Sequence, residues 1–389
     1  MKAMRWLLLP VFAAMLAGCG TMADPTTWFG GDDPALEPAE LVDFTPVIRP
    51  RQLWRMDIGD TGTAYNRLMP AVRDGVLYVA NAKGDLRALD AESGAQTWLV
   101  ETGLPASAGP GVGDGLVVLG TSEAQIVAFS MDTGEERWRR DLTSEILAVP
   151  AVADDLVVVH TADGKLFGLN AADGEQLWIY DHKVPVLTLR GSSSPVISSG
   201  TVYCGLAGGK MVALALDTGL VEWEQHVTVP SGRSDLERMV DVDADPLVYS
   251  GTVYGAAYQG DVAAMGEGSG KIFWKREMSV YNNMAANWQQ LAVTDAQGNV
   301  WSLDPDSGSA RWRQQALRNR GLTAPALQGD YTVVGDFEGY LHWLSSSDGS
   351  MAARMDIGDA IVAPPVAVDD VLYVLTSDGK LVSLGLPEE

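Results

Sequence analysis

A glycine followed four residues later by a tryptophan recurs along this chain at intervals of about 38 to 51 residues: Gly94/Trp98, Gly134/Trp138, Gly174/Trp178, Gly219/Trp223, Gly270/Trp274 and Gly308/Trp312. A seventh copy has Gly349 followed by Ala353 in the tryptophan position. Self-similarity at a nearly constant period of this size indicates a repeat architecture, in which each unit buries its apolar surface against its neighbours.

Each repeat has the composition of several short strands joined by tight turns. In the first, the β-forming run Val76–Val79 precedes a turn at Gly84-Asp85, and a second turn at 90–94 precedes the strand-like segment 96–100. A proline, which suits a strand start or edge, opens most units: Pro70, Pro110, Pro150, Pro195, Pro246, Pro325 and Pro364, with Ala286 in the equivalent place of the sixth. Four strands in about 40 residues predict a propeller blade.

The repeats predict an all-β protein, an eight-bladed β-propeller with four-stranded blades. The last unit, from Pro364 to Leu384, lacks a Gly-to-Trp strand, and Gln52–Arg55 at the other terminus supplies one. We therefore expect the N-terminal strand to pair with the C-terminal blade and close the ring, which leaves no open sheet edge at the junction. The repeated tryptophans are expected to pack between blades, and the repeated aspartates to hold turns, because the dense Asp/Asn loop of a calcium site is absent.

The N-terminus has the pattern of an export signal. Lys2 and Arg5 precede the apolar run 6–16, which is too short to span a bilayer. The following Leu16-Ala17-Gly18-Cys19 resembles the bacterial lipoprotein signal, which implies cleavage before Cys19, lipidation of Cys19 and, with Gly20 next, export to the outer membrane. The alternative is a plain signal peptide. The predicted organisation is a signal peptide at 1–18, a lipidated cysteine with a proline-rich flexible tether at 19–50, and the propeller at 51–386.

Composition and motifs argue against several classes of function. The formal net charge of −24 would repel phosphate backbones, so nucleic acid is not an expected partner. Cys204 is the only cysteine besides Cys19, which excludes a disulfide within the mature ring, and we expect it to be a small buried hydrophobic residue. The four histidines lie in different repeats, and no nucleophile elbow, phosphate loop or zinc motif is present. The sequence predicts no catalytic residue, no metal and no cofactor.

Two overlong connections between blades are the candidate binding site. From the tryptophan position to the next opening proline position, most connections span about 11 to 13 residues, but Trp178 to Pro195 spans 17 and Trp223 to Pro246 spans 23; Trp54 to Pro70, with 16, is a smaller excess. Because these two connections belong to adjacent junctions, we expect them to project side by side from one face. The first ends in an alternating leucine pair and an arginine, which suits recognition of a partner. The alternative is that the leucines pack back onto the ring.

The whole chain resembles the BamB family, the lipoprotein subunits of the outer-membrane β-barrel assembly machine. The segments that carry the resemblance are Leu187–Gly191, Asp241–Asp243 and Val334–Trp343; the repeats alone resemble pyrroloquinoline-quinone (PQQ) enzymes more generally. The resemblance implies a non-enzymatic scaffold that binds the periplasmic domains of the central barrel subunit and assists folding and insertion of outer-membrane proteins. The family's partner-binding residues correspond here to Leu187, Leu189, Arg190, Asp241 and Asp243.

Two other functions fit parts of the pattern. A PQQ-dependent periplasmic dehydrogenase would use the same repeat, but the adjacent-cysteine pair of several such enzymes is absent. A general periplasmic chaperone would instead expose a sheet edge to unfolded barrel strands, and crosslinking from position 189 would separate it from the scaffold.

Overall fold

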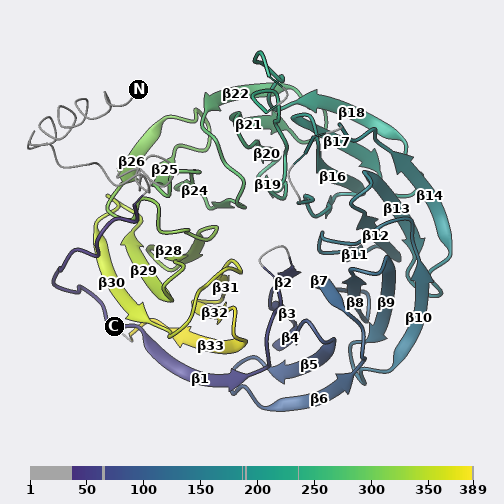
Figure 1. Cartoon of the computed structure of the whole chain (residues 1–389), viewed down its shortest axis with the longest axis horizontal. Helices are drawn as coiled ribbons and strands as arrows, with labels where there is room; N and C mark the ends of the chain where they lie inside the picture. The colour runs from purple at the N-terminus through teal and green to yellow at the C-terminus, as the bar shows by residue number, and fades with distance from the viewer. Residues whose placement is uncertain (1–36, 64–65, 186, 189–190, 235, 388–389) are drawn as a thin grey trace, which may run out of the picture. The chain divides into compact units, whose positions relative to one another are not determined.

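The computed structural model describes residues 37–63, 66–185, 187–188, 191–234 and 236–387. The compact unit from Pro38 to Glu389 is a ring of eight sheets, shown in Figure 1, and the described residues form strands and turns without a helix. No described segment is therefore a helix long and apolar enough to cross a membrane. The signal peptide and Cys19 fall outside the described residues.

Seven blades follow the chain in order from the ring centre outwards, each with four antiparallel strands. The first three blades are β3 (Ala71–Arg73), β4 (Val76–Ala80), β5 (Asp85–Asp90) and β6 (Gln96–Glu101); β7 (Ala106–Gly113), β8 (Leu116–Thr121), β9 (Gln125–Ser130) and β10 (Glu136–Asp141); β11 (Ala151–Ala153), β12 (Leu156–His160), β13 (Lys165–Asn170) and β14 (Gln176–Asp181). The fourth and fifth are β15 (Val196–Ser198), β16 (Thr201–Leu206), β17 (Lys210–Ala215) and β18 (Val221–His226); β19 (Leu247–Tyr249), β20 (Thr252–Ala256), β21 (Asp261–Gly266) and β22 (Ile272–Glu277). The sixth and seventh are β23 (Ala285–Ala286), β24 (Leu291–Thr294), β25 (Val300–Leu303) and β26 (Ala310–Gln314); β27 (Ala326–Gln328), β28 (Tyr331–Gly335), β29 (Tyr340–Ser345) and β30 (Met351–Asp356).

The eighth blade joins the two ends of the ring, as predicted. It consists of β31 (Val366–Val368), β32 (Val371–Leu375) and β33 (Lys380–Gly385), with β1 (Arg51–Asp57) as its outermost strand. β1 pairs antiparallel with β33, from Arg51 opposite Gly385 to Asp57 opposite Lys380, and the two strands lie side by side in Figure 1. One blade carries an unexpected addition: the two-residue strand β2 (Arg67–Leu68) pairs parallel with β7 near the ring centre.

The hydrophobic core lies between the blades, where the repeated tryptophans were expected. One cluster, for example, joins Val118 and Trp138 of the second blade to Val157 and Phe167 of the third. In addition, the six repeated tryptophans and Trp54 each donate a hydrogen bond of 2.7 to 3.1 Å from Nε1 to a backbone carbonyl of the next blade: Trp54 to Ala91, Trp98 to Met131, Trp138 to Ala171, Trp178 to Leu216, Trp223 to Glu267, Trp274 to Pro305 and Trp312 to Ser346.

The junction between the seventh and eighth blades, where Ala353 replaces the tryptophan, is joined differently. Gln328 is fully buried and donates from Nε2 to the carbonyls of Asp370 (2.7 Å) and Leu384 (3.1 Å) in the eighth blade. Its Oε1 accepts a 2.8 Å hydrogen bond from Nε1 of the buried Trp343. A side-chain amide thus satisfies the buried Trp343 N–H and the buried Leu384 carbonyl, and links the two blades without the repeated tryptophan contact.

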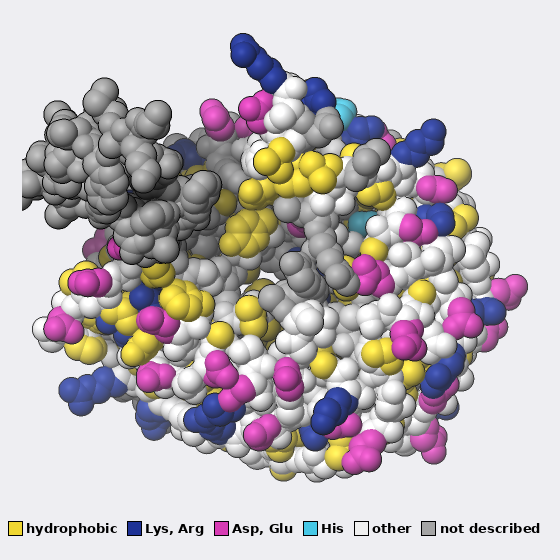
Figure 2. Space-filling model, viewed as in Figure 1, with side chains coloured by type: hydrophobic (Ala, Val, Ile, Leu, Met, Phe, Trp, Pro, Cys, Tyr) yellow, Lys and Arg dark blue, Asp and Glu magenta, His cyan; other side chains and the backbone are white. Residues whose placement is uncertain are grey.

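The surface carries both signs of charge with an excess of acids. Figure 2 shows acidic and basic side chains spread over the visible face around a central hollow, without a broad basic area. The boundary between tether and propeller at residue 51 remains a prediction, although the compact unit already includes the chain from Pro38.

Candidate functional site

The two overlong connections lie side by side, as their sequence positions predicted. The first insertion loop, residues 182–195, follows β14, and the second, residues 227–246, follows β18. The backbone N–H of Ser194 donates a 2.6 Å hydrogen bond to Asp245 Oδ1, and Gly191 lies against the Asp243 carboxyl, where an added Cβ would approach Cγ to 3.2 Å. A side chain at position 191 would require the Asp243 carboxyl to shift by a few tenths of an ångström, so the two loops are closely packed here.

The structure separates the predicted binding residues into different environments. Leu187 is 45% exposed, as a docking residue requires and unlike a leucine packed onto the ring. Leu189 and Arg190 lie outside the described residues. Asp241 is only 3% exposed, accepts the Gly208 N–H at 3.1 Å and bridges Ala207 through its backbone, so it holds the second insertion loop against the fourth blade. Asp243 is half-buried beside it.

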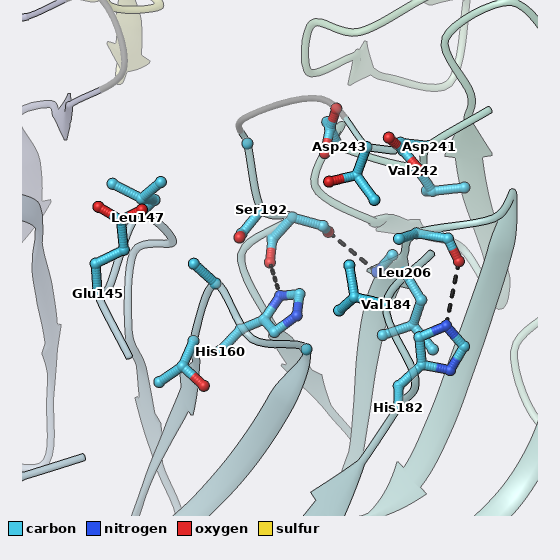
Figure 3. A pocket seen from close by; sticks show the side chains of 18 residues that line it. Glu145, Leu147, His160, His182, Val184, Ser192, Leu206, Asp241, Val242 and Asp243 are labelled. Carbon is cyan, nitrogen blue, oxygen red and sulfur yellow. Dashed lines mark hydrogen bonds between the residues drawn. The ribbon is translucent and has the colours of Figure 1, made fainter. Parts of the chain in front are cut away.

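A cavity of about 240 Å³ opens between the insertion loops and the neighbouring blades. Figure 3 shows Asp243 between Ser192 and Asp241, above the imidazoles of His160 and His182. Each imidazole contacts a backbone carbonyl: His160 Nδ1 lies 2.9 Å from the Ser193 oxygen, and His182 Nε2 lies 3.2 Å from the Ala207 oxygen. The two histidines therefore hold the backbone of the loops in place. The described residues contain no cluster of three or more acidic, histidine or cysteine side chains able to hold a metal.

Burial lowers the reactivity of the histidine and cysteine at the inner side of this cavity. Desolvation lowers the pKa of His160, which keeps its imidazole neutral. Cys204 is buried beside it, with Sγ 3.4 Å from His160 Nδ1, and desolvation raises the pKa of its thiol, so reactive thiolate is disfavoured. The expectation that Cys204 is a small buried residue is confirmed.

Asp243 has the most strongly altered carboxyl at the site. Burial, followed by repulsion from Asp241, raises the pKa of Asp243 to about 7, while the positive charge of Arg67 opposes the shift and Asp245 adds to it. The carboxyl is therefore partly protonated near neutral pH. A partner's basic group approaching it would favour the charged form.

Arg67 ties the two insertion loops together, and sequence reasoning did not identify it. From β2 its Nη1 donates to the Ser192 carbonyl at 3.0 Å, Ser194 Oγ at 3.2 Å and Asp245 Oδ1 at 2.5 Å, and its Nη2 donates to the Asp243 carbonyl at 3.3 Å. A planar guanidinium with five donors suits this fan of acceptors. The available signal was the third overlong connection, Trp54 to Pro70, which carries Arg67 to the ring centre.

The chain has close relatives among bacterial proteins. Residues 49–106, 82–314 and 296–385 match the family described as outer membrane protein assembly factor BamB. The proteins of that name from Alkalilimnicola ehrlichii and Pseudomonas aeruginosa are similar, at 55% identity over 91% of this chain and 93% of theirs, and at 49% over 90% and 92%.

Solved structures of similar fold include a protein with the same name as these relatives. BamB from Moraxella catarrhalis superposes with a TM-score of 0.79 at 25% identity, covering 87% of this chain and all of that one. A quinohemoprotein alcohol dehydrogenase from Comamonas testosteroni reaches 0.69 at 14% identity, over 87% of this chain and 78% of that one, which shows a shared propeller fold alone. This chain belongs to the BamB family of outer membrane protein assembly factors.

Proposed function

We propose that this protein is a lipid-anchored, non-enzymatic scaffold of the outer-membrane β-barrel assembly machine. Its insertion loops bind the periplasmic domains of the machine's central barrel subunit, and this docking assists folding and insertion of outer-membrane proteins. Relatives that share about half of its residues over nine-tenths of its length are named as outer membrane protein assembly factors. A scaffold function also fits the site, because His160 and His182 contact backbone carbonyls of the structure.

The observation that carries the proposed binding site is the pairing of an exposed apolar residue with a rigid support. Leu187 is exposed on the first insertion loop, while Arg67 and Asp245 join the base of that loop to the second. A preorganised anchor favours binding, because little conformational entropy is lost on docking.

Pull-down with the central subunit's soluble periplasmic domains tests this site. We expect the combined change Leu187→Ala, Leu189→Ala and Arg190→Ala to weaken binding by about 100-fold or more, the effect of losing two or more hot-spot residues. Leu220→Ala is the matched control, because Leu220 is 69% exposed in a turn outside the insertion loops. Undiminished binding by a triple variant with wild-type circular dichroism would contradict the proposed site.

The proposed anchor is tested separately. In this proposal residues 1–18 are removed, Cys19 carries the lipid, residues 19–50 connect the lipid to the propeller, and residues 51–386 form the propeller. Multiple acyl chains hold a protein stably at a bilayer, whereas the unlipidated ring has no described membrane-spanning helix. Cys19→Ser should therefore move the protein from the outer-membrane fraction to the soluble periplasm. Retention of the variant in outer membranes free of the assembly machine would refute the anchor.

A further inference from the structure

The chain just before the propeller lies on the ring. From Pro38 to Ile48, here named the docked arm, it follows the sixth and seventh blades. The Ala39 N–H donates to the Arg318 carbonyl at 2.9 Å, and the Val47 N–H donates to the Ala352 carbonyl at 2.8 Å. Hydrogen bonds at both ends fix the arm's course along the ring.

Two arginines hold the backbone of the arm. Arg320 Nη1 donates to the Ala39 carbonyl at 3.0 Å, and Arg354 Nη2 donates to the Val42 carbonyl at 3.1 Å. The Arg354 guanidinium also lies 5.2 Å from the centre of the Phe44 ring. Charged donors make stronger hydrogen bonds to carbonyls than neutral ones, so this contact outweighs an ordinary loop contact.

A buried cluster orients Arg320 toward the arm. Asp336 Oδ2 accepts from Arg320 Nε at 2.8 Å and lies 3.0 Å from His342 Nε2, and Glu338 binds Arg320 Nη2. Arg320 is only 3% exposed, and Asp336 and His342 are fully buried. Burying such charges is costly unless every group is paired. Here the third guanidinium nitrogen, Nη1, donates to the arm's Ala39 carbonyl.

The apolar side chains of the arm divide into an inward and an outward set. Leu41 packs against the cluster that contains Trp312 and Leu322, and Ile48 packs against the cluster of the seventh and eighth blades. Val42 and Val47 point away and are 62% and 77% exposed. The arm therefore has one half-buried face against the ring, as a specifically bound segment does.

The arm begins on the face of the ring that carries the insertion loops. Arg318 and Arg320 belong to the connection from outer strand β26 to inner strand β27, and in a ring of equivalent four-stranded blades all such connections lie on one face. Hydrogen bonds follow this face from one connection to the next: Asp245 N–H to Asn283 Oδ1 at 2.8 Å, and Asn282 Nδ2 to the Leu322 carbonyl at 2.9 Å.

Without the arm the chain would leave the ring on the other side. β1 starts at Arg51, opposite Gly385 and beside the turns that join the third and outermost strands of the blades. Docking thus moves the exit point to the insertion-loop face. It also shortens the tether that starts after Cys19 from about 31 residues to about 18, which span at most about 60 Å when fully extended.

We infer that the docked arm is an orienting strap: the cluster of Arg320, Arg354, Asp336 and His342 binds residues 38–48 so that the tether pulls the insertion-loop face toward the lipid surface. The inference rests on the proposed lipid anchor at Cys19. The shorter tether raises the effective concentration of this face near the bilayer by about twofold, because that concentration falls as roughly the −3/2 power of tether length.

Docking itself is tested by hydrogen exchange on the full protein in solution. In the wild type, we expect the amides of Ala39, Val47 and Ile48 to exchange at least about tenfold more slowly than in the double variant Leu41→Ser/Ile48→Ser, which removes the inward apolar contacts. Val42→Ser/Val47→Ser is the matched control, because it changes the outward pair and should keep the protection. Rapid exchange of these amides in the wild type would overturn the strap.

Orientation is tested in lipid vesicles that contain an acceptor dye in the bilayer. Cys204 is buried, so a fluorophore can be placed specifically at Ser231→Cys on the second insertion loop or at Asp217→Cys in a turn of the opposite face. Energy transfer should be stronger from position 231 than from 217, and Leu41→Ser/Ile48→Ser should remove the difference. Equal transfer in a protein whose arm is protected would overturn the orienting role. Failure to bind vesicles with normal arm protection would instead refute the lipid anchor.

Discussion

The indole ring of Trp178 lies directly over Gly219 of the following blade. An added Cβ at Gly219 would stand 2.6 Å from Trp178 Cδ2, and the residue has a φ of +66°. The Trp178 Nε1 reaches past it to the Leu216 carbonyl at 2.8 Å. The glycine of each repeat therefore receives the tryptophan of the blade before it, and the motif that recurs in the sequence is the joint between blades.

Gly219→Ala should lower the free energy of unfolding by about 2 to 5 kcal/mol, because it combines left-handed backbone strain with displacement of the indole. Gly200→Ala is the control: Gly200 has a similar φ of +77° but nothing within 4 Å of an added Cβ. Gly200→Ala should lower the free energy of unfolding only by the backbone strain, about 1 to 2 kcal/mol. Thermal and denaturant unfolding of both variants measures the difference, and equal losses would refute the role of the repeated tryptophan contact.

Gln328→Leu should destabilise the junction of the seventh and eighth blades by about 2 to 4 kcal/mol. The substitution leaves the buried Trp343 N–H and the buried Leu384 carbonyl without this partner and removes the hydrogen bond to the Asp370 carbonyl. Gln297→Leu, in an exposed turn, is the control and should change stability by less than about 0.5 kcal/mol. Denaturant unfolding checks both, and a neutral Gln328→Leu would show that the junction does not depend on this amide.

Arg67→Met should loosen the insertion loops while leaving the blades intact. The substitution removes the donors to Ser192, Ser194 and Asp245. We expect the free energy of unfolding to fall by only about 1 to 3 kcal/mol, because these partly solvated groups regain some hydration. Amide exchange near Ser194 should accelerate, and binding of the central subunit's periplasmic domains should weaken. Arg73→Met, an exposed arginine in the next strand, is the control. Unchanged exchange at Ser194 in Arg67→Met would contradict the pinning role.

The stability contributed by Asp243 should depend on pH in the direction opposite to that of a salt-bridged aspartate. Its pKa rises from 3.8 to about 7 on folding, so between these values the folded state holds a proton that the unfolded state has lost. Stability from this group is complete below about pH 4 and falls as the pH rises through about 7. Asp243→Asn removes the titration, so its melting temperature relative to the wild type should increase between about pH 5 and pH 8.

The control for that measurement is Asp217→Asn, which makes the same substitution at an exposed turn. Its melting temperature relative to the wild type should not rise over the same pH range. A pH-independent difference between Asp243→Asn and the wild type would show that the Asp243 carboxyl does not keep its proton in the folded state.

The sequence by itself determined the ring. The glycine–tryptophan motif recurs because each blade packs on the next through the same contact. The period of the motif predicted the size of a blade. The absence of the motif from the last repeat predicted that β1 closes the ring. Adjacent junctions in sequence are adjacent in space, and the two insertion loops therefore met as predicted. Each of these relations links neighbouring repeats.

Only the tertiary structure decided the contacts that cross the ring or run along its rim. Arg67 reaches Asp245 across 178 residues of sequence, and Arg320 reaches Ala39 across 281. A repeat pattern constrains neighbouring blades but not which distant loops converge after closure. The prolines near the N-terminus accordingly predicted a tether, whereas residues 38–48 find donors and an apolar surface on blades that are complete only once the ring has closed.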